Sequence, residues 1–393
     1  NTPPEMQKKN KDMLKTLEGF ENCYIDTSKD YRNTLYHADA IIMDRVELFF
    51  IDVSKVISGD SLYIGTLFGK IKVDDMETLN PDADISIGGF ATDISITNAS
   101  TTRDINLYSL AGDVYIDNVH AGNNIDIEGF NNIDINNSVV GNDIKLSNSE
   151  LENDSSTTDG NGSIKLTNIS IGNDLSVELN GKMNIEDVTV ANNSSIITKN
   201  NSVVTIDKFK SNTLDIADKG QSNATIKDSA INNIKAELNG DLNISNLTNS
   251  EMKAILNGKS SITGSKLGNA DLTNKGEAVI KDSTVNSMTA SNESKFELTA
   301  TPVENLALTN NSKGTTSIHD TTVNSMTASN DGELEVNDFN SNKVVLTSAG
   351  NTNISNSNIN DLNANVSGNT TINNLSNSLM SLVNSGNSTI SKS

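Results

Sequence analysis

The side chains in this sequence that could hold a metal ion or act as nucleophiles are few and lie far apart. The three histidines are His37, His120 and His319, and the single cysteine is Cys23. A metal site needs several His, Cys, Asp or Glu side chains that meet at one point. We therefore predict no metal site from the histidines, and no disulfide within the chain because Cys23 has no second cysteine to pair with.

Two acidic features could bind a cation or a partner. The aspartates Asp84, Asp93, Asp104 and Asp113 recur at similar intervals and could bind Ca²⁺ weakly at chain corners. The segment 148–162 is rich in Glu, Asp, Ser and Thr and interrupts the repeat that surrounds it. We interpret the aspartates as solvated turn residues, and the segment as a protruding loop that could serve as a contact site.

A carbohydrate-processing enzyme is an alternative that the sequence does not favour. Polysaccharide lyases and hydrolases need clustered carboxylates, a basic residue and aromatic side chains on which sugar rings rest. Beyond residue 82 the only arginine is Arg103, and beyond residue 130 the aromatic residues are Phe209, Phe296 and Phe339. We predict that the chain is not an enzyme and has no catalytic, cofactor-binding or metal-binding residues.

The composition argues against an ordinary globular domain. Hydrophobic residues make up 35% of the 393 residues and aromatic residues 4%, while Asn, Ser, Thr and Gly are abundant. Such a chain can bury small aliphatic side chains only in a thin, repetitive core. Its net charge of −22 repels phosphate, so we predict no nucleic-acid partner. No apolar run reaches the length of about 18 residues that predicts a membrane span.

An Ile-Xaa-Ile pattern, often preceded by Asp or Asn, repeats beyond residue 82. One series of first members recurs about every 20 residues, at Ile85, Ile105, Ile125, Ile144 and Ile164. A second series lies between them, at Ile94, Val114 and Ile133. Successive strand residues point to opposite faces, so each unit directs two aliphatic side chains inward and the middle residue outward. The pattern predicts a coil with two strands.

The second half of the chain keeps the repeat, with steps of about 18–21 residues. Its main ladder consists of Leu166, Ile185, Ile206, Ile226, Ile244, Ile262, Ile280, Leu298, Ile318, Val336, Ile354, Ile372 and Ile390. Gly350, Gly368 and Gly386 recur at one corner, and each is followed by Asn. We expect these glycines to supply a positive φ and the asparagines to form a hydrogen-bonded ladder.

These patterns predict an all-β fold, a parallel β-helix of about sixteen coils of about 18–20 residues, over residues 81–393. Residues 1–80 differ from the repeat. Apolar residues at helical spacing between Met13 and Phe20 follow two prolines and predict a short helix, and the apolar runs between Ile41 and Val73 predict capping strands. We therefore expect an N-terminal capping and assembly region at 1–80.

The repeat resembles the β-helical passengers of secreted bacterial adhesins, of the filamentous-haemagglutinin or autotransporter-passenger type. The resemblance rests on the coil length, on the ladder from Ile85 to Ile390, and on the Asp-Ile-Xaa-Ile units at 84–87 and 93–96. It implies a structural or adhesive role at the cell surface or outside the cell. It also implies a bacterial source and secretion with removal of a signal peptide.

Three functions follow as expectations. The ladder keeps its register as far as Ile390, and three explanations for its uncapped last coil compete: the chain is truncated, the end pairs with itself, or it docks on another subunit. We favour docking on another copy of the chain. The first expectation is therefore a non-enzymatic extracellular structural protein that stacks head-to-tail into a filament or layer, with itself as partner. The alternative is a monomeric adhesin rod that displays binding loops to a host or neighbouring cell. The second alternative is a carbohydrate-processing β-helix.

Overall fold

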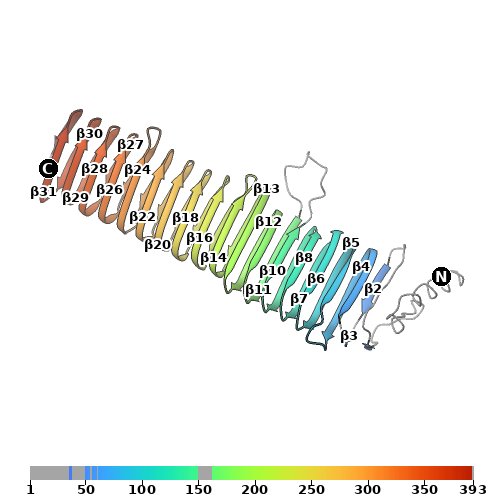
Figure 1. The fold of residues 1–393 in the computed structure, drawn as a ribbon. Coiled ribbons are helices and arrows are strands. Elements are labelled where there is room, and N and C mark those ends of the chain that lie inside the picture. Colours follow the sequence, from blue (N-terminus) through green and yellow to red (C-terminus); the bar gives the residue numbers. More distant parts are fainter. Residues whose placement is uncertain (1–34, 38–48, 54, 60, 149–161, 392–393) are drawn as a thin grey trace. The chain divides into compact units, whose positions relative to one another are not determined.

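The computed structural model describes residues 35–37, 49–53, 55–59, 61–148 and 162–391. These residues form an all-β parallel solenoid of about 17 turns with about 19 residues in each turn, as the repeat predicts (Figure 1). The predicted N-terminal helix and the body of the predicted loop lie outside the described residues. Within these ranges, no helix is long and apolar enough to cross a membrane.

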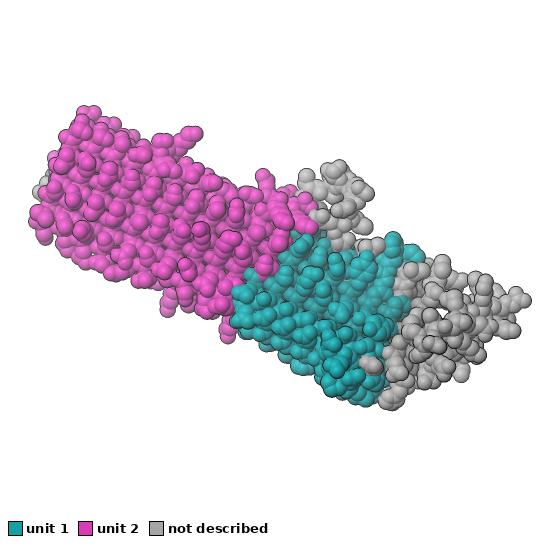
Figure 2. Space-filling model, in the orientation of Figure 1, with its two compact units in different colours: residues 1–194 teal, residues 195–393 magenta. Residues whose placement is uncertain are grey.

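The chain divides into two compact units, residues 1–194 and residues 195–393 (Figure 2). The division expected at residue 80 stays a prediction. Strand β4 (Leu62–Thr78) pairs in register with β5 (Ile85–Thr101) on either side of that point, and Leu62 lies opposite Ile85. The strands that precede residue 80 therefore share the hydrogen-bonding pattern of the solenoid.

The strands of unit 1 pair in parallel with strands of neighbouring turns. Besides β4 and β5 they are β1 (Leu35–His37), β2 (Phe49–Val53), β3 (Lys55–Ser58), β6 (Ile105–Ala111), β7 (Asp113–Ala121), β8 (Ile125–Phe130), β9 (Asn132–Val140), β10 (Ile144–Asn148), β11 (Gly162–Ile171) and β12 (Leu175–Val190). Because strands such as β5 and β7 bond to the turns on both sides, their backbone polar groups are satisfied between turns rather than within them.

Unit 2 repeats the same arrangement with shorter and more regular turns. Its strands are β13 (Asn193–Asp207), β14 (Lys210–Asp218), β15 (Asn223–Lys227), β16 (Ala230–Leu238), β17 (Leu242–Ser245), β18 (Thr248–Leu256), β19 (Lys259–Thr263), β20 (Lys266–Asn274), β21 (Glu277–Lys281), β22 (Thr284–Asn292), β23 (Lys295–Thr299), β24 (Val303–Asn310), β25 (Thr315–His319), β26 (Thr322–Asn330), β27 (Glu333–Asn337), β28 (Asn340–Ser348), β29 (Asn351–Val366), β30 (Asn369–Ser376), β31 (Leu379–Asn384) and β32 (Asn387–Ser391). Most turns in this unit hold one strand of four or five residues and one of eight or nine.

The core is the stack of inward aliphatic side chains that the Ile-Xaa-Ile pattern predicts. Ile85 lies opposite Ile105, which lies opposite Ile125, and all three are fully buried. Each such side chain contributes roughly 1.5–3 kcal/mol by leaving water. In unit 2 the predicted ladder is also confirmed, since its members pair turn by turn from Ile206 to Ile390.

One residue of the predicted first series was placed in the wrong column. Ile164 lies opposite Ile133 and therefore belongs to the second series. Ile144, the residue before it in the predicted series, lies opposite Leu175 instead. The segment 149–161 lies between these strands in the sequence, so the step from Ile133 to Ile164 is shifted from about 20 to 31 residues while the two columns continue in order. The same shift sets Lys165 beside Asp134, at 3.6 Å, whereas Lys145 reaches Asp126 at 3.8 Å as the sequence indicates.

The corners use glycine and asparagine differently from the prediction. Gly350, Gly368 and Gly386 do not have a positive φ, and the expectation that they do was wrong. A Cβ atom on Gly350 would overlap the carbonyl oxygen of Gly332 in the preceding turn, so close approach of the backbones requires glycine there. Among the described residues, the left-handed conformation occurs instead at glycines such as Gly264 and at sixteen other residues, which are Asn or Asp apart from Lys208 and Ala300.

Asparagine ladders join the turns both outside and inside the solenoid. The predicted outer ladder is confirmed, since the Asn369 Nδ2 atom donates to the Asn351 side-chain oxygen at 3.1 Å. A second ladder is buried. Its side-chain amides donate in sequence from Asn274 to Asn292 at 2.8 Å, from Asn292 to Asn310 at 2.9 Å, and from Asn310 to Asn330 at 2.7 Å. The four amides are at most 1% exposed, so these hydrogen bonds form in a low-dielectric interior.

Asp218 closes a turn in unit 2 and gives this unit a dependence on pH. Its carboxylate accepts hydrogen bonds from the backbone N–H groups of Gly220 at 2.8 Å and Ser222 at 2.9 Å. Burial raises the pKa of Asp218, but the hydrogen bonds, led by that from Ser222, outweigh burial and hold the pKa below 3.8. A lowered folded-state pKa stabilises the fold above the unfolded-state value, and the stabilisation is lost as the pH falls through the folded-state value.

We expect Asp218→Asn to remove this acid-sensitive contribution. Hydrogen exchange of the β13–β17 amides, divided by the intrinsic exchange rate at each pH, reports the local opening equilibrium. This opening should increase more in the wild-type chain than in the variant when the pH is lowered from neutral to below 3.8. Asp215→Asn is the control, because it removes a carboxylate from the same strand that instead meets Lys235 at 3.4 Å on the surface. Equal acid sensitivity in the wild type and in Asp218→Asn would contradict the prediction.

Candidate functional site

The exposed aromatic side chains of the described residues gather in unit 1. Tyr63, Phe68, Phe90, Tyr108 and Tyr115 are 40–52% exposed. The three phenylalanines noted in the sequence beyond residue 130, Phe209, Phe296 and Phe339, are instead fully buried in unit 2. A solenoid with so few aromatic residues gains core stability by burying them. Five exposed rings on about three turns therefore point to a binding surface rather than to the core.

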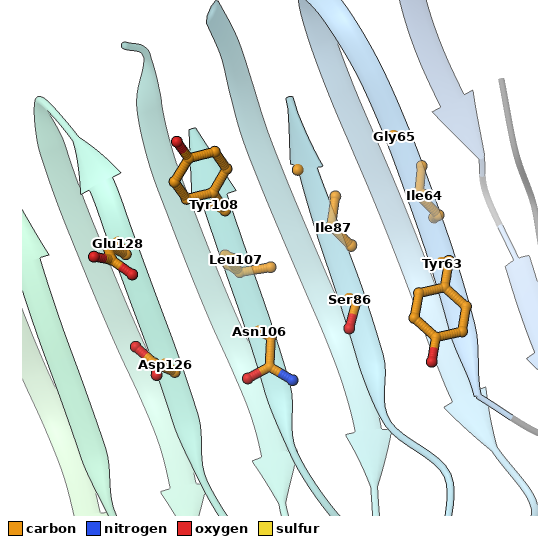
Figure 3. Close-up of a pocket in the computed structure, with 11 residues that line it drawn as sticks. Tyr63, Ile64, Gly65, Ser86, Ile87, Asn106, Leu107, Tyr108, Asp126 and Glu128 are labelled. Carbon is orange, nitrogen blue, oxygen red and sulfur yellow. The ribbon is translucent and has the colours of Figure 1, made fainter. Parts of the chain in front are cut away.

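Two columns of outward residues form a shallow hollow on this surface (Figure 3). In the first column Tyr63, Ser86, Asn106 and Asp126 lie opposite one another on β4, β5, β6 and β8. In the second column the corresponding residues are Gly65, Gly88, Tyr108 and Glu128. The hollow has a volume of about 450 Å³ and is open to solvent.

The hollow exists because outward positions on β4 and β5 carry small residues. Gly65 and Gly88 occupy places where other turns have Tyr or Glu, and Ser86 lies between the tyrosines (Figure 3). A Cβ atom on Gly88 would lie 2.8 Å from the carbonyl oxygen of Tyr108, so glycine is needed there for close packing. Beneath this surface Ile64, Ile87 and Leu107 belong to the aliphatic core and hold the strands rigidly.

Polar groups complete the hollow. Asn106, Asp126 and Glu128 supply amide and carboxylate groups at the end formed by β6 and β8. The Asp126 side chain is 41% exposed and meets the Lys145 ammonium at 3.8 Å, while Glu128 is exposed. An exposed pair of this kind contributes little to stability, so these carboxylates are available to a ligand.

A pair of aromatic rings extends this surface farther along β4 and β5. Phe68 on β4 and Phe90 on β5 meet edge to face, with ring centroids 5.7 Å apart at 70°. Rings in this arrangement attract one another by about 0.5–1.5 kcal/mol beyond the area that they bury. The pair is nevertheless 40% and 52% exposed, so much of its apolar surface remains in contact with water.

Rigid exposed tyrosines beside amide and carboxylate groups suit sugars. The C–H face of a sugar ring can rest on an aromatic face, and its hydroxyl groups can bond to the neighbouring polar side chains. A nucleic acid could also stack on tyrosine, but its phosphates would meet Asp126, Glu128 and a strongly acidic chain. The hollow therefore fits a carbohydrate better than a nucleic acid.

The tyrosines of the hollow were not among the residues predicted from the sequence, although the sequence contains a signal for them. In Leu62-Tyr63-Ile64 and Val114-Tyr115-Ile116 a tyrosine occupies the middle of an inward pair, where the side chain must face solvent. Tyr108 follows the inward Leu107 in the same way. An aromatic residue at such a position is exposed by the strand period alone, so its place on the surface is predictable.

The structure places the other singled-out residues apart from this hollow. His120 lies on β7 in unit 1, and His319 lies on β25 in unit 2. His37 belongs to β1, and Cys23 lies outside the described residues. The aspartate series serves the corners, since the Asp84 carboxylate accepts the Asp104 N–H at 3.2 Å. Within the described ranges, no group of three or more His, Cys, Asp and Glu could hold a metal.

His319 has neighbours that resemble part of a catalytic triad. Its Nε2 atom lies 2.9 Å from the Thr299 hydroxyl oxygen, and its Nδ1 atom lies 3.4 Å from the Asp320 carboxylate. However, Glu297 also reaches Nε2, at 3.2 Å, and Thr299 is only 8% exposed. A nucleophile must be accessible to its substrate, so this cluster fits a link between turns better than a catalytic site.

Comparison with known proteins identifies no protein that this chain is similar to. No family model matches the chain, and no curated protein and no solved structure matches it.

Proposed function

We propose that the chain is a non-enzymatic, extracellular adhesin-type solenoid that binds glycans through the hollow of unit 1. The observation that carries the proposal is the position of Tyr63 and Tyr108, two exposed tyrosines on either side of small residues on a rigid parallel sheet. A parallel β-solenoid is compatible with a structural or adhesive role. The partner is then a carbohydrate on a host or neighbouring cell surface.

A carbohydrate-processing role has one specific observation in its favour. Asp126 and Glu128 are two carboxylates on one face of the same strand, and glycosidases use a pair of carboxylates. The general acid of such a pair works from a site that excludes water. Because Glu128 is exposed and Asp126 is half-buried beside Lys145, binding fits this site better than hydrolysis does.

We expect Tyr63→Ala and Tyr108→Ala each to weaken glycan binding about tenfold. The loss of one stacking platform costs roughly 1.4 kcal/mol, near the upper end for a specific aromatic contact. The wild-type chain is first applied to an array of defined oligosaccharides. The strongest binder is then titrated into the wild type and into both variants by calorimetry. The oligosaccharides incubated with the wild type are also analysed for hydrolysis products.

Tyr115→Ala is the matched control for this experiment. Tyr115 is 42% exposed on β7 in the same unit, but it does not line the hollow. Its replacement should leave the affinity unchanged. The proposal fails if both hollow variants bind as the wild type does. Release of shortened oligosaccharides would replace the binding role with the carbohydrate-processing one.

Self-assembly through the end of the solenoid stays a prediction. In the described structure β31 pairs with β29 and β32 with β30, and Ile390, which continues the inward ladder opposite Ile372, is 42% exposed. A further turn in the same register would cover this side chain, whether it came from the same chain or from a second copy. Electron microscopy of the protein at several concentrations would distinguish filaments from single particles.

A further inference from the structure

We propose that the glycan recognised by the hollow carries free amino groups, as a chain of unacetylated amino sugars does. This inference rests on the proposed function and deepens it. It draws on the asymmetry of the hollow, in which the tyrosines are spread over β4 and β6 while both carboxylates lie on β8 (Figure 3). None of the described residues that line the hollow is Lys or Arg.

Tyr108 and Glu128 form the first half of an ammonium site. They lie opposite each other on neighbouring strands and are both exposed, so their side chains stand side by side on the outer surface. An ammonium group is attracted to the face of an aromatic ring and to a carboxylate. A sugar ring that stacks on Tyr108 would bring an amino substituent within reach of Glu128.

Asn106 and Asp126 form the second half, at the preceding outward position on the same strands. They also lie opposite each other. Lys145, the cation that the structure places at Asp126, approaches at 3.8 Å and has a side chain that is 62% exposed, so it can swing away at little cost. The amide of Asn106 can accept from or donate to sugar hydroxyls beside the ammonium group.

The arrangement also indicates how the ligand lies. The four lining strands follow one another from turn to turn, and neighbouring strands are about 4.8 Å apart, so the hollow extends across the strands for about 14 Å. A short oligosaccharide laid across the strands would meet Tyr63, then Tyr108, and then the carboxylates. Acidic glycans would be repelled at that last end, and acetylated amino sugars would offer no charge to it.

The test compares two tetramers with one backbone, β-1,4-linked glucosamine and β-1,4-linked N-acetylglucosamine, under conditions that protonate the free amines. Calorimetry on the full chain should show about fivefold tighter binding of the glucosamine tetramer, the size expected for two exposed charge contacts. Glu128→Gln should reduce that preference to about twofold. Tyr108→Ala should weaken the binding of both tetramers.

Glu186→Gln controls for net charge, because a cationic ligand is attracted to any acidic protein. Glu186 is exposed on β12 and does not line the hollow, so its variant should keep the fivefold preference. Equal affinity for both tetramers, with both dependent on Tyr108, would overturn this inference and leave the proposed function standing. Tetralysine that binds as tightly as the glucosamine tetramer and depends on Glu128 would also overturn it, in favour of a basic peptide. The absence of any glycan binding that depends on Tyr63 or Tyr108 would overturn both.

Discussion

Asn292→Leu should destabilise the turns around β22 by about 3 kcal/mol. The Asn292 amide is fully buried, donates to the Asn310 side-chain oxygen at 2.9 Å, and accepts from Asn274 at 2.8 Å. It also donates to the backbone oxygen of Thr315 at 3.0 Å. Leucine has the same number and branching of side-chain heavy atoms and leaves no cavity, but it leaves these buried polar groups short of a partner, at roughly 1 kcal/mol each.

The measurement is local, because a repeat protein can open a few turns at a time. Hydrogen exchange followed by mass spectrometry should show faster exchange in β20 to β26 of the Asn292→Leu variant. Asn305→Leu is the control, since Asn305 is exposed on the next turn and its replacement should change the local opening free energy by less than about 0.5 kcal/mol. Equal effects of the two substitutions would mean that the buried ladder adds nothing to stability.

The two-residue period of the strands made the architecture predictable, but it did not reveal the buried asparagine ladder. An Ile at every second position fixes which side chains face inward, so the columns from Ile206 to Ile390 followed from the sequence. Asn usually marks the surface. Yet Asn274 and Asn292 occupy the inward place that Leu238 and Leu256 occupy in earlier turns, and a comparison of equivalent offsets in the sequence reveals them.

The register across the segment 149–161 could not be predicted from periodicity. Ile164 fits a step of about 20 residues from Ile144, but the chain uses the intervening residues for a segment outside the repeat, so Ile164 pairs with Ile133. The arrangement of residues in the hollow could not be predicted from periodicity either. The exposure of Tyr63 and Tyr108 follows from the strand pattern, whereas their placement around Gly88 depends on how unequal turns stack.

Gly350→Ala should destabilise the corresponding corner of unit 2 by about 3 kcal/mol. The added Cβ would overlap the carbonyl oxygen of Gly332, a backbone atom of the preceding turn that cannot rotate away. The turns would have to separate locally and lengthen the hydrogen bonds between β27 and β29, and such overpacking costs about 1–3 kcal/mol or more. Hydrogen exchange in β27 to β30 would report the loss.

Gly350→Asn separates the two reasons for which a corner can need glycine. If the corner needed a positive φ, Asn would restore most of the stability, because Asn enters the left-handed region readily, as it does at Asn356 with φ 48°. If the need is for close approach, Asn carries the same Cβ and should destabilise at least as much as Ala. Gly65→Ala is the control in unit 1, since its Cβ would lie 3.6 Å from the Gly88 carbonyl oxygen, an ordinary contact, and should be tolerated. Rescue by Asn would reinstate the conformational explanation, whereas equal losses for Ala and Asn would establish that glycine is present so that successive turns can touch.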